Sequence, residues 1–168
     1  KRLLHESGQE ASVAVLEKAS EVGARSLSGA IVDPRSLREL FPNYNDADFP
    51  FEAEVTEEHL YYLTATKKIP FPFVPPPMSH HNCFVTSLGK LTRWLGEICE
   101  DEGVDIFCGF AGTELLYDGD QVIGVRTGDR GIDKNGEKKT QFEPGADIHA
   151  KVVILGEGTR GSLTKKLI

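Results

Sequence analysis

The chain contains 168 residues, with a formal net charge of −7, 27% charged residues and 39% hydrophobic residues. The length suits one globular domain or most of one, and the composition excludes a wholly disordered chain. The acidic balance argues against a nucleic-acid partner, because binding to a phosphate backbone needs clustered Lys and Arg. No apolar run approaches the ~18 residues of a membrane-spanning helix, and residues 1–8 lack the apolar region of a signal peptide.

The N-terminal part of the chain alternates between helix and strand signals. It opens on residues typical of a helix end closed by Gly8. The apolar run at 11–18 predicts a strand buried on both faces, as in a parallel sheet. After a Gly-rich segment, Asp33 and Pro34 are typical of a helix cap and a first helical residue, which predicts a helix through Leu40.

Residues 41–78 are rich in aromatic residues and proline and show no long period. The prolines of 69–78 favour extended or polyproline-like backbone. A linker would leave Phe71, Phe73 and Val74 in water, so we expect a packed excursion over the face of the domain instead.

The second half of the chain predicts one long helix and then mostly strands. Apolar residues recur at helical spacing from Leu88 to Ile98, which predicts an amphipathic helix over about 87–102. The dipeptide Asn135-Gly136 is a hairpin signal. The further elements expected are strands beginning at 104 and spanning 114–117, 122–127 and 148–155, and a helix over 159–168.

The clearest chemical signal is Glu17 at the end of the first strand. In dinucleotide-binding βαβ units an acid at this position accepts hydrogen bonds from a ribose hydroxyl, and the Gly-rich phosphate loop lies ~20 residues earlier. That position falls before Lys1, so we expect the first strand and the phosphate loop of such a unit to lie outside this sequence. An acid after a strand is also a common surface residue, and this alternative stays open.

A second segment, 152–162, has the pattern of a strand, Gly-x-Gly-x-x-Gly and a helix. The sequence after Gly161 is too short for the second strand and ribose acid of a dinucleotide unit. Glu157 would also place a carboxylate among amides that should face a phosphate. We therefore interpret this segment as a different strand–turn–helix of the same sheet.

Other candidate sites are weaker. The adjacent His80 and His81 would point to opposite faces of a strand, so we expect polar loop residues rather than metal ligands. Cys83 and Ser87 have no His and Asp partners arranged as a catalytic triad. Three cysteines without a CxxC pair predict reduced thiols and no disulfide framework, zinc site or iron–sulfur site; they are Cys83, Cys99 and Cys108.

A set of longer motifs spans nearly the whole chain. In order they are Val15-Leu16-Glu17-Lys18, Glu21-Val22-Gly23-Ala24, Leu27-Ser28-Gly29-Ala30-Ile31-Val32-Asp33-Pro34, Leu40-Phe41-Pro42, Val55-Thr56-Glu57-Glu58, Pro77-Met78, Ser87-Leu88-Gly89, Trp94-Leu95-Gly96-Glu97, Gly131-Ile132-Asp133-Lys134-Asn135-Gly136 and Gly156-Glu157-Gly158-Thr159-Arg160-Gly161-Ser162-Leu163. Together they resemble the electron transfer flavoprotein–ubiquinone oxidoreductases, a family of glutathione-reductase-like FAD enzymes. The long run from Leu27 to Pro34 is far more specific than any Gly fingerprint.

The resemblance implies an α/β protein with a glutathione-reductase-like FAD/NAD(P)-binding fold, incomplete because the first strand and phosphate loop are absent, with an added β-rich excursion. It assigns 1–40 to the FAD-binding domain, 41–86 to the Pro- and aromatic-rich excursion, and 87–168 to a helix, strands and the return to the FAD-binding domain. The function implied is that of an electron-transferring-flavoprotein dehydrogenase, which passes electrons from electron transfer flavoprotein to ubiquinone.

The resemblance also implies a set of cofactor contacts, each carried over by position. Glu17 and Lys18 would meet the adenosine ribose, and Ser28, Gly29 and Ala30 would approach the FAD. The remaining contacts are Gly109, Ala111 and Gly112 by backbone near the adenine, and Gly156, Glu157 and Gly158 in a turn on the cofactor side. Two places depart from the family pattern: Gly156, where many such enzymes have Ala, and His80–Cys83, where the family often shows an Asn-His-Gly-Asn-like stretch.

The cofactor implied for this chain is FAD, and a 4Fe–4S cluster is expected only in a missing C-terminal region. The partners implied are electron transfer flavoprotein, ubiquinone and a membrane surface reached through the full-length protein. The location implied is the matrix side of the mitochondrial inner membrane, or the cytoplasmic face of a bacterial inner membrane. We expect the 168-residue chain alone to be inactive. Two alternatives stay open: a related flavoprotein of the nitrogen-fixation or geranylgeranyl-reductase type, and a flavin-free binding module on the same scaffold.

Overall fold

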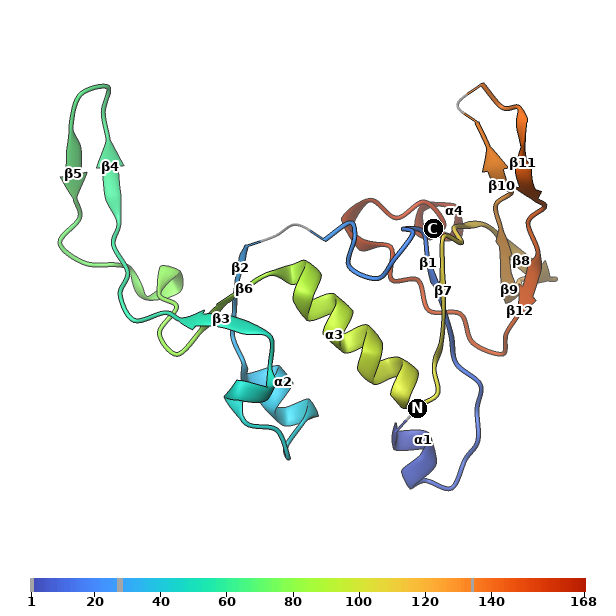
Figure 1. Cartoon of the computed structure of the whole chain (residues 1–168), viewed down its shortest axis with the longest axis horizontal. Coiled ribbons are helices and arrows are strands. Elements are labelled where there is room, and N and C mark those ends of the chain that lie inside the picture. Colours follow the sequence, from blue (N-terminus) through green and yellow to red (C-terminus); the bar gives the residue numbers. More distant parts are fainter. Residues whose placement is uncertain (1, 27–28, 134) are drawn as a thin grey trace. The chain divides into compact units, whose positions relative to one another are not determined.

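The computed structural model describes residues 2–26, 29–133 and 135–168, which form a mixed α/β structure with five small sheets (Figure 1). The α/β class expected from the sequence is confirmed at this level. The chain divides into two compact units. The terminal unit consists of Lys1–Val22 and Cys99–Ile168, and the central unit consists of Gly23–Ile98.

The terminal unit begins with a short helix and a parallel strand pair. Helix α1 (Arg2–Glu6) is closed as predicted by Gly8, which has a φ of +69°. Strand β1 (Ala14–Glu17) pairs in parallel with β7 (Asp105–Cys108). The parallel pairing was expected, but the predicted burial on both faces is wrong, since Val15 is 42% exposed. Within the described residues β1 has only β7 beside it, so its other edge remains open.

A three-stranded antiparallel sheet follows β7. Strands β8 (Gly112–Asp118) and β9 (Gln121–Thr127), both predicted from the sequence, pair as an antiparallel hairpin. Strand β12 (Asp147–His149) pairs with the other edge of β9, which places β9 in the middle of the sheet. Gly124 of β9 lies opposite His149, and the missing side chain of Gly124 lets the carbonyl of Ile148 approach its backbone closely.

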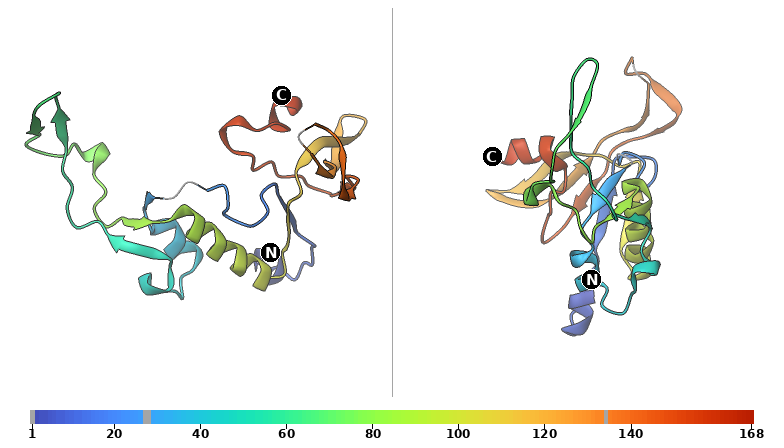
Figure 2. Two further views of the ribbon diagram at one scale, coloured as in Figure 1. Left: turned by 45° about the horizontal axis from the view of Figure 1, so that its top comes forward. Right: turned by 90° about the vertical axis from the view of Figure 1, so that its left-hand side faces the viewer.

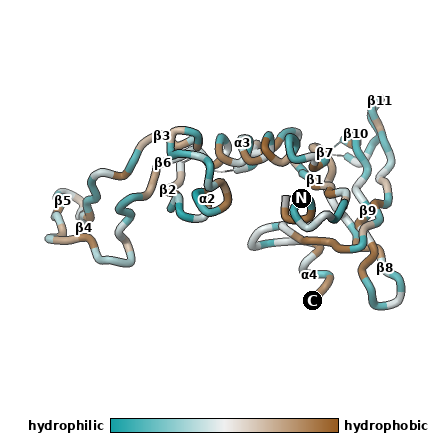
Figure 3. Tube along the Cα trace, turned by 90° about the horizontal axis from the view of Figure 1, so that it is seen from below, coloured by the Kyte–Doolittle hydropathy of each residue, from teal (hydrophilic) through white to brown (hydrophobic). Residues whose placement is uncertain are grey.

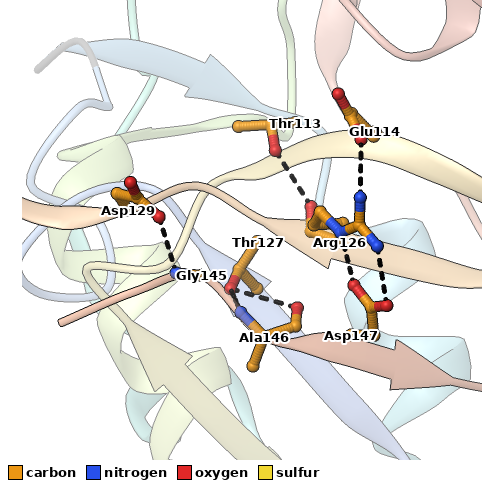
Figure 4. Close-up of polar contacts among 8 residues, drawn as sticks. All are labelled: Thr113, Glu114, Arg126, Thr127, Asp129, Gly145, Ala146 and Asp147. Atoms are coloured by element: carbon orange, nitrogen blue, oxygen red, sulfur yellow. Dashed lines mark hydrogen bonds and ion pairs between the residues drawn. The ribbon is translucent and has the colours of Figure 1, made fainter.

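Polar side chains tie the three strands together (Figure 4). Arg126 donates from Nε and Nη2 to the carboxylate of Asp147 at 2.6 and 2.8 Å, and from Nη1 to Glu114 at 3.2 Å. The two bonds from Arg126 to Asp147 hold the pKa of Asp147 below its usual range. Buried Thr127 uses its hydroxyl to accept the N–H of Ala146 at 2.9 Å. Because the ion pairs are exposed, they fix strand register more than they add stability.

A second hairpin extends from this sheet. Strands β10 (Arg130–Ile132) and β11 (Lys138–Glu143) are antiparallel, as Asn135-Gly136 predicts. Asp133 Oδ1 accepts the N–H of Asn135 at 2.8 Å and so closes the turn. Lys134, which is part of the family motif at this turn, lies outside the described residues.

The prediction of a strand over 148–155 is correct only at its start, because β12 ends at His149. Val152 and Ile154 are 75% and 89% exposed. A strand needs a neighbouring backbone with which to exchange hydrogen bonds. No described strand pairs with this apolar run.

The C-terminal helix is shorter than the predicted 159–168. A 3₁₀ turn covers Gly158–Arg160, and α4 spans only Thr164–Leu167. Gly161 separates the two pieces, because its backbone (φ −51°, ψ 136°) is not helical. Among the described helices, none is both long enough and apolar enough to cross a membrane.

The sheet of the central unit has β6 (Phe84–Thr86) between β2 (Ala30–Val32) and β3 (Phe51–Glu54), with both pairings antiparallel. Thr86 is almost fully buried in it, and its hydroxyl donates to the carbonyl of Pro50 at 2.7 Å. This bond satisfies the hydroxyl, whose burial without a partner would be costly.

The two helices of the central unit follow their sequence signals closely. Helix α2 (Arg35–Leu40) begins one residue later than predicted, although Asp33 Oδ1 still accepts the N–H of Arg35 at 3.0 Å. Helix α3 (Leu88–Asp101) confirms the amphipathic helix, and apolar and polar positions alternate along it in Figure 3. Its apolar stripe includes buried Leu91.

The first part of the predicted excursion is packed. A 3₁₀ turn at Asp46–Asp48 brings Phe49 toward α3. The Phe49 ring is 4% exposed and its centroid lies 5.6 Å from that of Trp94. Phe41 and Tyr44 surround the same indole at 5.3 and 6.0 Å. This aromatic cluster is the core of the central unit.

The second part of the excursion is exposed, which corrects the prediction. Strands β4 (Tyr61–Leu63) and β5 (Lys68–Pro70) form a hairpin that reaches away from the β2–β6–β3 sheet (Figure 2). A 3₁₀ turn at Pro76–Met78 follows. Phe71 and Phe73 are 49% and 67% exposed. A two-stranded ribbon has no second layer of its own to cover such side chains.

A hydrogen-bonded clasp joins the two ends of this hairpin arm. The carboxylate of Glu58, before β4, accepts the backbone N–H of His80 at 2.9 Å and its Nδ1–H at 2.6 Å. The hydroxyl of Ser79 also donates to it at 3.1 Å. These bonds, led by the one from the His80 backbone, hold the pKa of Glu58 below its usual value. His80 is therefore part of a structural contact rather than an isolated loop residue.

The lowered pKa makes the clasp sensitive to acid. The contact contributes stability above the ordinary carboxyl pKa, and this contribution is lost as pH falls through the lowered folded-state pKa. We expect Glu58→Gln to reduce the thermal midpoint at neutral pH and to flatten its decline in acid. Thermal melts of both proteins across the acid range measure this, with exposed Glu97→Gln, on α3, as the matched control. Parallel curves for the Glu58 variant and the parent would contradict the prediction.

Candidate functional site

Hydrogen bonds connect the carboxyl ends of β1 and β7 around Glu17, at one edge of the strand pair. Glu17 lies opposite Cys108 in the parallel register. Its backbone carbonyl accepts the N–H of Phe110 at 3.0 Å, and the carbonyl of Ala19 accepts the N–H of Gly109 at 2.6 Å. The Glu17 side chain accepts the N–H of Ala19 at 2.5 Å. The carboxylate is thereby fixed at the edge of a parallel sheet where α/β proteins bind their ligands.

The guanidinium group of Arg130 packs against Gly109 and Phe110 at the same edge. Gly109 has a φ of +81°, and a side chain there would meet Arg130 Nη2 at 3.3 Å. The guanidinium carbon of Arg130 lies 4.3 Å from the ring centroid of Phe110. Its Nη1 donates to Glu143 at 3.2 Å across the β10–β11 ribbon. The sequence did not single out Arg130, because its contact with Phe110, 20 residues away, is a tertiary feature.

Ala111 and Gly112 have partners within the protein. The carbonyl of Ala111 accepts the N–H of Gly128 at 2.9 Å. A side chain on Gly112 would meet Val125 Cγ1 at 2.9 Å and Leu163 Cδ1 at 3.1 Å. The glycine at 112 is thus required by packing of β8 against the C-terminal segment.

The turn at Gly156, Glu157 and Gly158 is closed by its own carboxylate. Glu157 accepts the backbone N–H groups of three residues and one hydroxyl, at 2.8–3.1 Å; the donors are Ser162, Leu163 and Thr164, with the Thr164 hydroxyl. These bonds, led by that of Thr164 N–H, lower the pKa of Glu157. A carboxylate of the protein itself occupies the amides of Ser162, Leu163 and Thr164, so in this conformation these amides do not face a phosphate. Side chains at Gly156 and Gly158 would meet no atom within 4 Å.

The remaining predicted residues lie elsewhere. Lys18 is exposed directly after β1. Gly29 has a φ of +79°, and a Cβ at this position would meet no atom within 4 Å. Gly29 and Ala30, which starts β2, belong to the central unit. Ser28 lies outside the described residues. Within the described ranges no three His, Cys, Asp or Glu side chains form a group that could hold a metal ion.

The structure defines a mixed α/β chain with an acid fixed at the end of a parallel strand pair. No family model matches the sequence. A mouse protein named electron transfer flavoprotein-ubiquinone oxidoreductase, mitochondrial, is 42% identical over an alignment of 169 positions that covers 99% of this chain and 27% of the mouse protein. A Pseudomonas aeruginosa protein with the corresponding name is 44% identical over an alignment of 168 positions that covers 97% of this chain and 30% of that protein.

The chain is therefore homologous, over nearly its whole length, to one segment of the electron transfer flavoprotein–ubiquinone oxidoreductases. The resemblance read from the sequence motifs is confirmed. The chain spans less than a third of the length of these curated relatives.

Proposed function

We propose that this chain is a segment of an FAD-dependent oxidoreductase that passes electrons from electron transfer flavoprotein to ubiquinone. The observation that carries the proposal is the 42–44% identity along almost the entire chain to proteins whose names contain this activity. Residues 1–40 and 87–168 then belong to a glutathione-reductase-like FAD domain, and 41–86 form an excursion from it. Strand β1 is the second strand of a dinucleotide-binding unit in this assignment.

The edge of β1 and β7 has the chemical groups that the adenosine end of FAD requires. Glu17 offers a fixed carboxylate acceptor for ribose hydroxyls, with Lys18 beside it. Gly109 has no side chain of its own, and the Arg130 guanidinium lies where one would be. The resemblance implies further cofactor contacts, which the proposal keeps without placing them beside Glu17: Ser28, Gly29, Ala30, Ala111, Gly112, Gly156, Glu157 and Gly158. Bound FAD would supply the redox chemistry, and the residues of this chain would hold and orient its nucleotide half.

The unpaired run Val152–Leu155 also fits this assignment. It is apolar, with Val152 and Ile154 exposed, and a strand contributed from outside the described residues would pair with it and cover these side chains. The pyrophosphate loop and the ligands of a 4Fe–4S cluster would lie outside this segment as well. Membrane association, on the matrix side of the mitochondrial inner membrane or the cytoplasmic face of a bacterial one, would belong to the whole protein.

The test uses the full-length protein that contains this segment. We expect it to purify with one FAD and to reduce ubiquinone when supplied with reduced electron transfer flavoprotein. A full-length protein without flavin would favour the binding-module alternative. A flavoprotein that ignores this donor would favour the nitrogen-fixation or geranylgeranyl-reductase type.

The isolated chain provides a further prediction. Residues 1–168 by themselves should retain no FAD through gel filtration, because the pyrophosphate lacks its helix N-terminus and backbone amide donors. The measurement is the ratio of flavin absorbance to protein in the eluted peak, with the full-length protein as the reference. Stoichiometric flavin on the 168-residue chain would contradict the prediction.

A further inference from the structure

Two contacts hold the Arg130 side chain near the carboxyl ends of β1 and β7, where the nucleotide is proposed to bind. Its guanidinium lies over the ring of Phe110 at 4.3 Å, and its Nη1 donates to Glu143 at 3.2 Å. A side chain at Gly109 would come within 3.3 Å of Nη2, so the glycine leaves the space that the guanidinium fills. The cofactor contacts carried over from the family motifs do not include Arg130 or the side chain of Phe110.

Phe110 is also bonded directly to Glu17, the residue proposed to bind the ribose. Its backbone N–H donates to the carbonyl of Glu17 at 3.0 Å, so the aromatic ring and the guanidinium are anchored one hydrogen bond away from Glu17. All of these residues lie in the terminal unit. A nucleotide whose ribose bonds Glu17 carries its base on the neighbouring ribose carbon, and the base must therefore lie along the same edge.

We propose that Arg130, supported by Phe110, is a further nucleotide-contact residue that takes the adenine end of the dinucleotide whose ribose bonds Glu17. The inference rests on the proposed function, since it assumes an adenine dinucleotide at this edge. A planar guanidinium stacks on aromatic rings and interacts with their electron-rich faces. The contact with Phe110 and the bond to Glu143 already restrict the side chain, so less of its freedom is lost when the base arrives.

Charge at the edge favours the same arrangement. Glu17 and Glu143 are acidic, and a dinucleotide adds the negative charge of its pyrophosphate. Lys18 follows Glu17 in the sequence, and Arg130 lies over Phe110, whose backbone N–H bonds Glu17. Removing Arg130 would take away a positive charge that offsets the negative charge of the pyrophosphate, which disfavours binding.

The experiment measures FAD binding to the full-length apoprotein by quenching of flavin fluorescence, with ADP as a competitor that carries only the adenine half. For Arg130→Ala we expect the Kd of FAD and the inhibition constant of ADP to rise together, by about tenfold. Arg130→Lys should lose most of the same affinity, because an ammonium does not stack. Exposed Arg93→Ala, on α3, is the matched control and should leave both constants unchanged.

The thermal midpoint of each apoprotein separates binding from folding. An unchanged midpoint with weaker FAD and ADP binding supports the inference. Normal FAD and ADP constants in Arg130→Ala, with the parent binding FAD, overturn the inference and leave the proposed function intact. Weaker FAD binding without any change in the ADP constant also overturns it. A parent protein that binds no FAD overturns the proposed function and the inference with it.

Discussion

Replacing Glu17 by alanine in the full-length protein should weaken FAD binding by roughly tenfold to 100-fold. The variant loses charge-assisted hydrogen bonds to ribose hydroxyls, which contribute roughly 1.5–3 kcal/mol. Because Glu17 Oε1 is held by the N–H of Ala19, the carboxylate is already oriented before the nucleotide binds. Titration of the apoprotein with FAD gives the affinity directly.

The matched control for Glu17 is Glu100→Ala. Glu100 is an exposed acid near the end of α3, and its removal changes the net charge by the same amount. Equal FAD affinities for the two variants would rule out the ribose role of Glu17. A loss of FAD binding only in the Glu17 variant would support it.

Gly124→Ala should be the most destabilising of the single-residue changes considered. The new methyl group would overlap the carbonyl oxygen of Ile148 and press on the Cα of His149, which are backbone atoms of the paired strand β12. Backbone cannot rotate aside as a side chain can, so β9 and β12 must separate. We expect a loss of about 2–4 kcal/mol in the free energy of unfolding, measured by denaturant titration of the full-length protein.

Gly156→Ala is the appropriate control for that measurement. A side chain at Gly156 would meet no atom within 4 Å, and this position does not use a positive φ. Its stability should therefore stay close to that of the parent. If both variants unfold at the same denaturant concentration, close packing at Gly124 is not important to the sheet.

Elements with a strong local pattern could be predicted from the sequence. The stripe from Leu88 to Ile98 specifies α3, and Asn135-Gly136 specifies the hairpin between β10 and β11, because turn geometry and helical periodicity depend on neighbouring residues. Glu17 could be found for the same reason, since an acid that directly follows an apolar strand run is a local signal. The parallel pairing of β1 was also correct.

Features that depend on distant contacts could not be predicted. The apolar run 152–155 has the composition of a strand, but a strand forms only where another backbone can pair with it. The exposure of Phe71 and Phe73 depends on what packs on the hairpin, which composition does not encode. Two contacts join residues about 20 positions apart: Arg130 with Phe110, and Glu58 with His80. The periods of a helix or strand relate only residues that are close in sequence, so they do not predict such contacts.

The backbone of the run that contains Val152 and Ile154 has no strand partner among the described residues, and this affects the solubility of isolated pieces of the protein. A short β-prone apolar segment that no described strand pairs with is a template onto which another strand can add. Lys151 and Glu157 are the nearest charges that flank it, and neither interrupts the run itself. When the neighbouring strand is absent, a second copy of the same run can take its place, so two chains would join edge to edge and then recruit more. A lysine introduced within the run should therefore keep pieces of this protein in solution at higher concentrations than the parent segment.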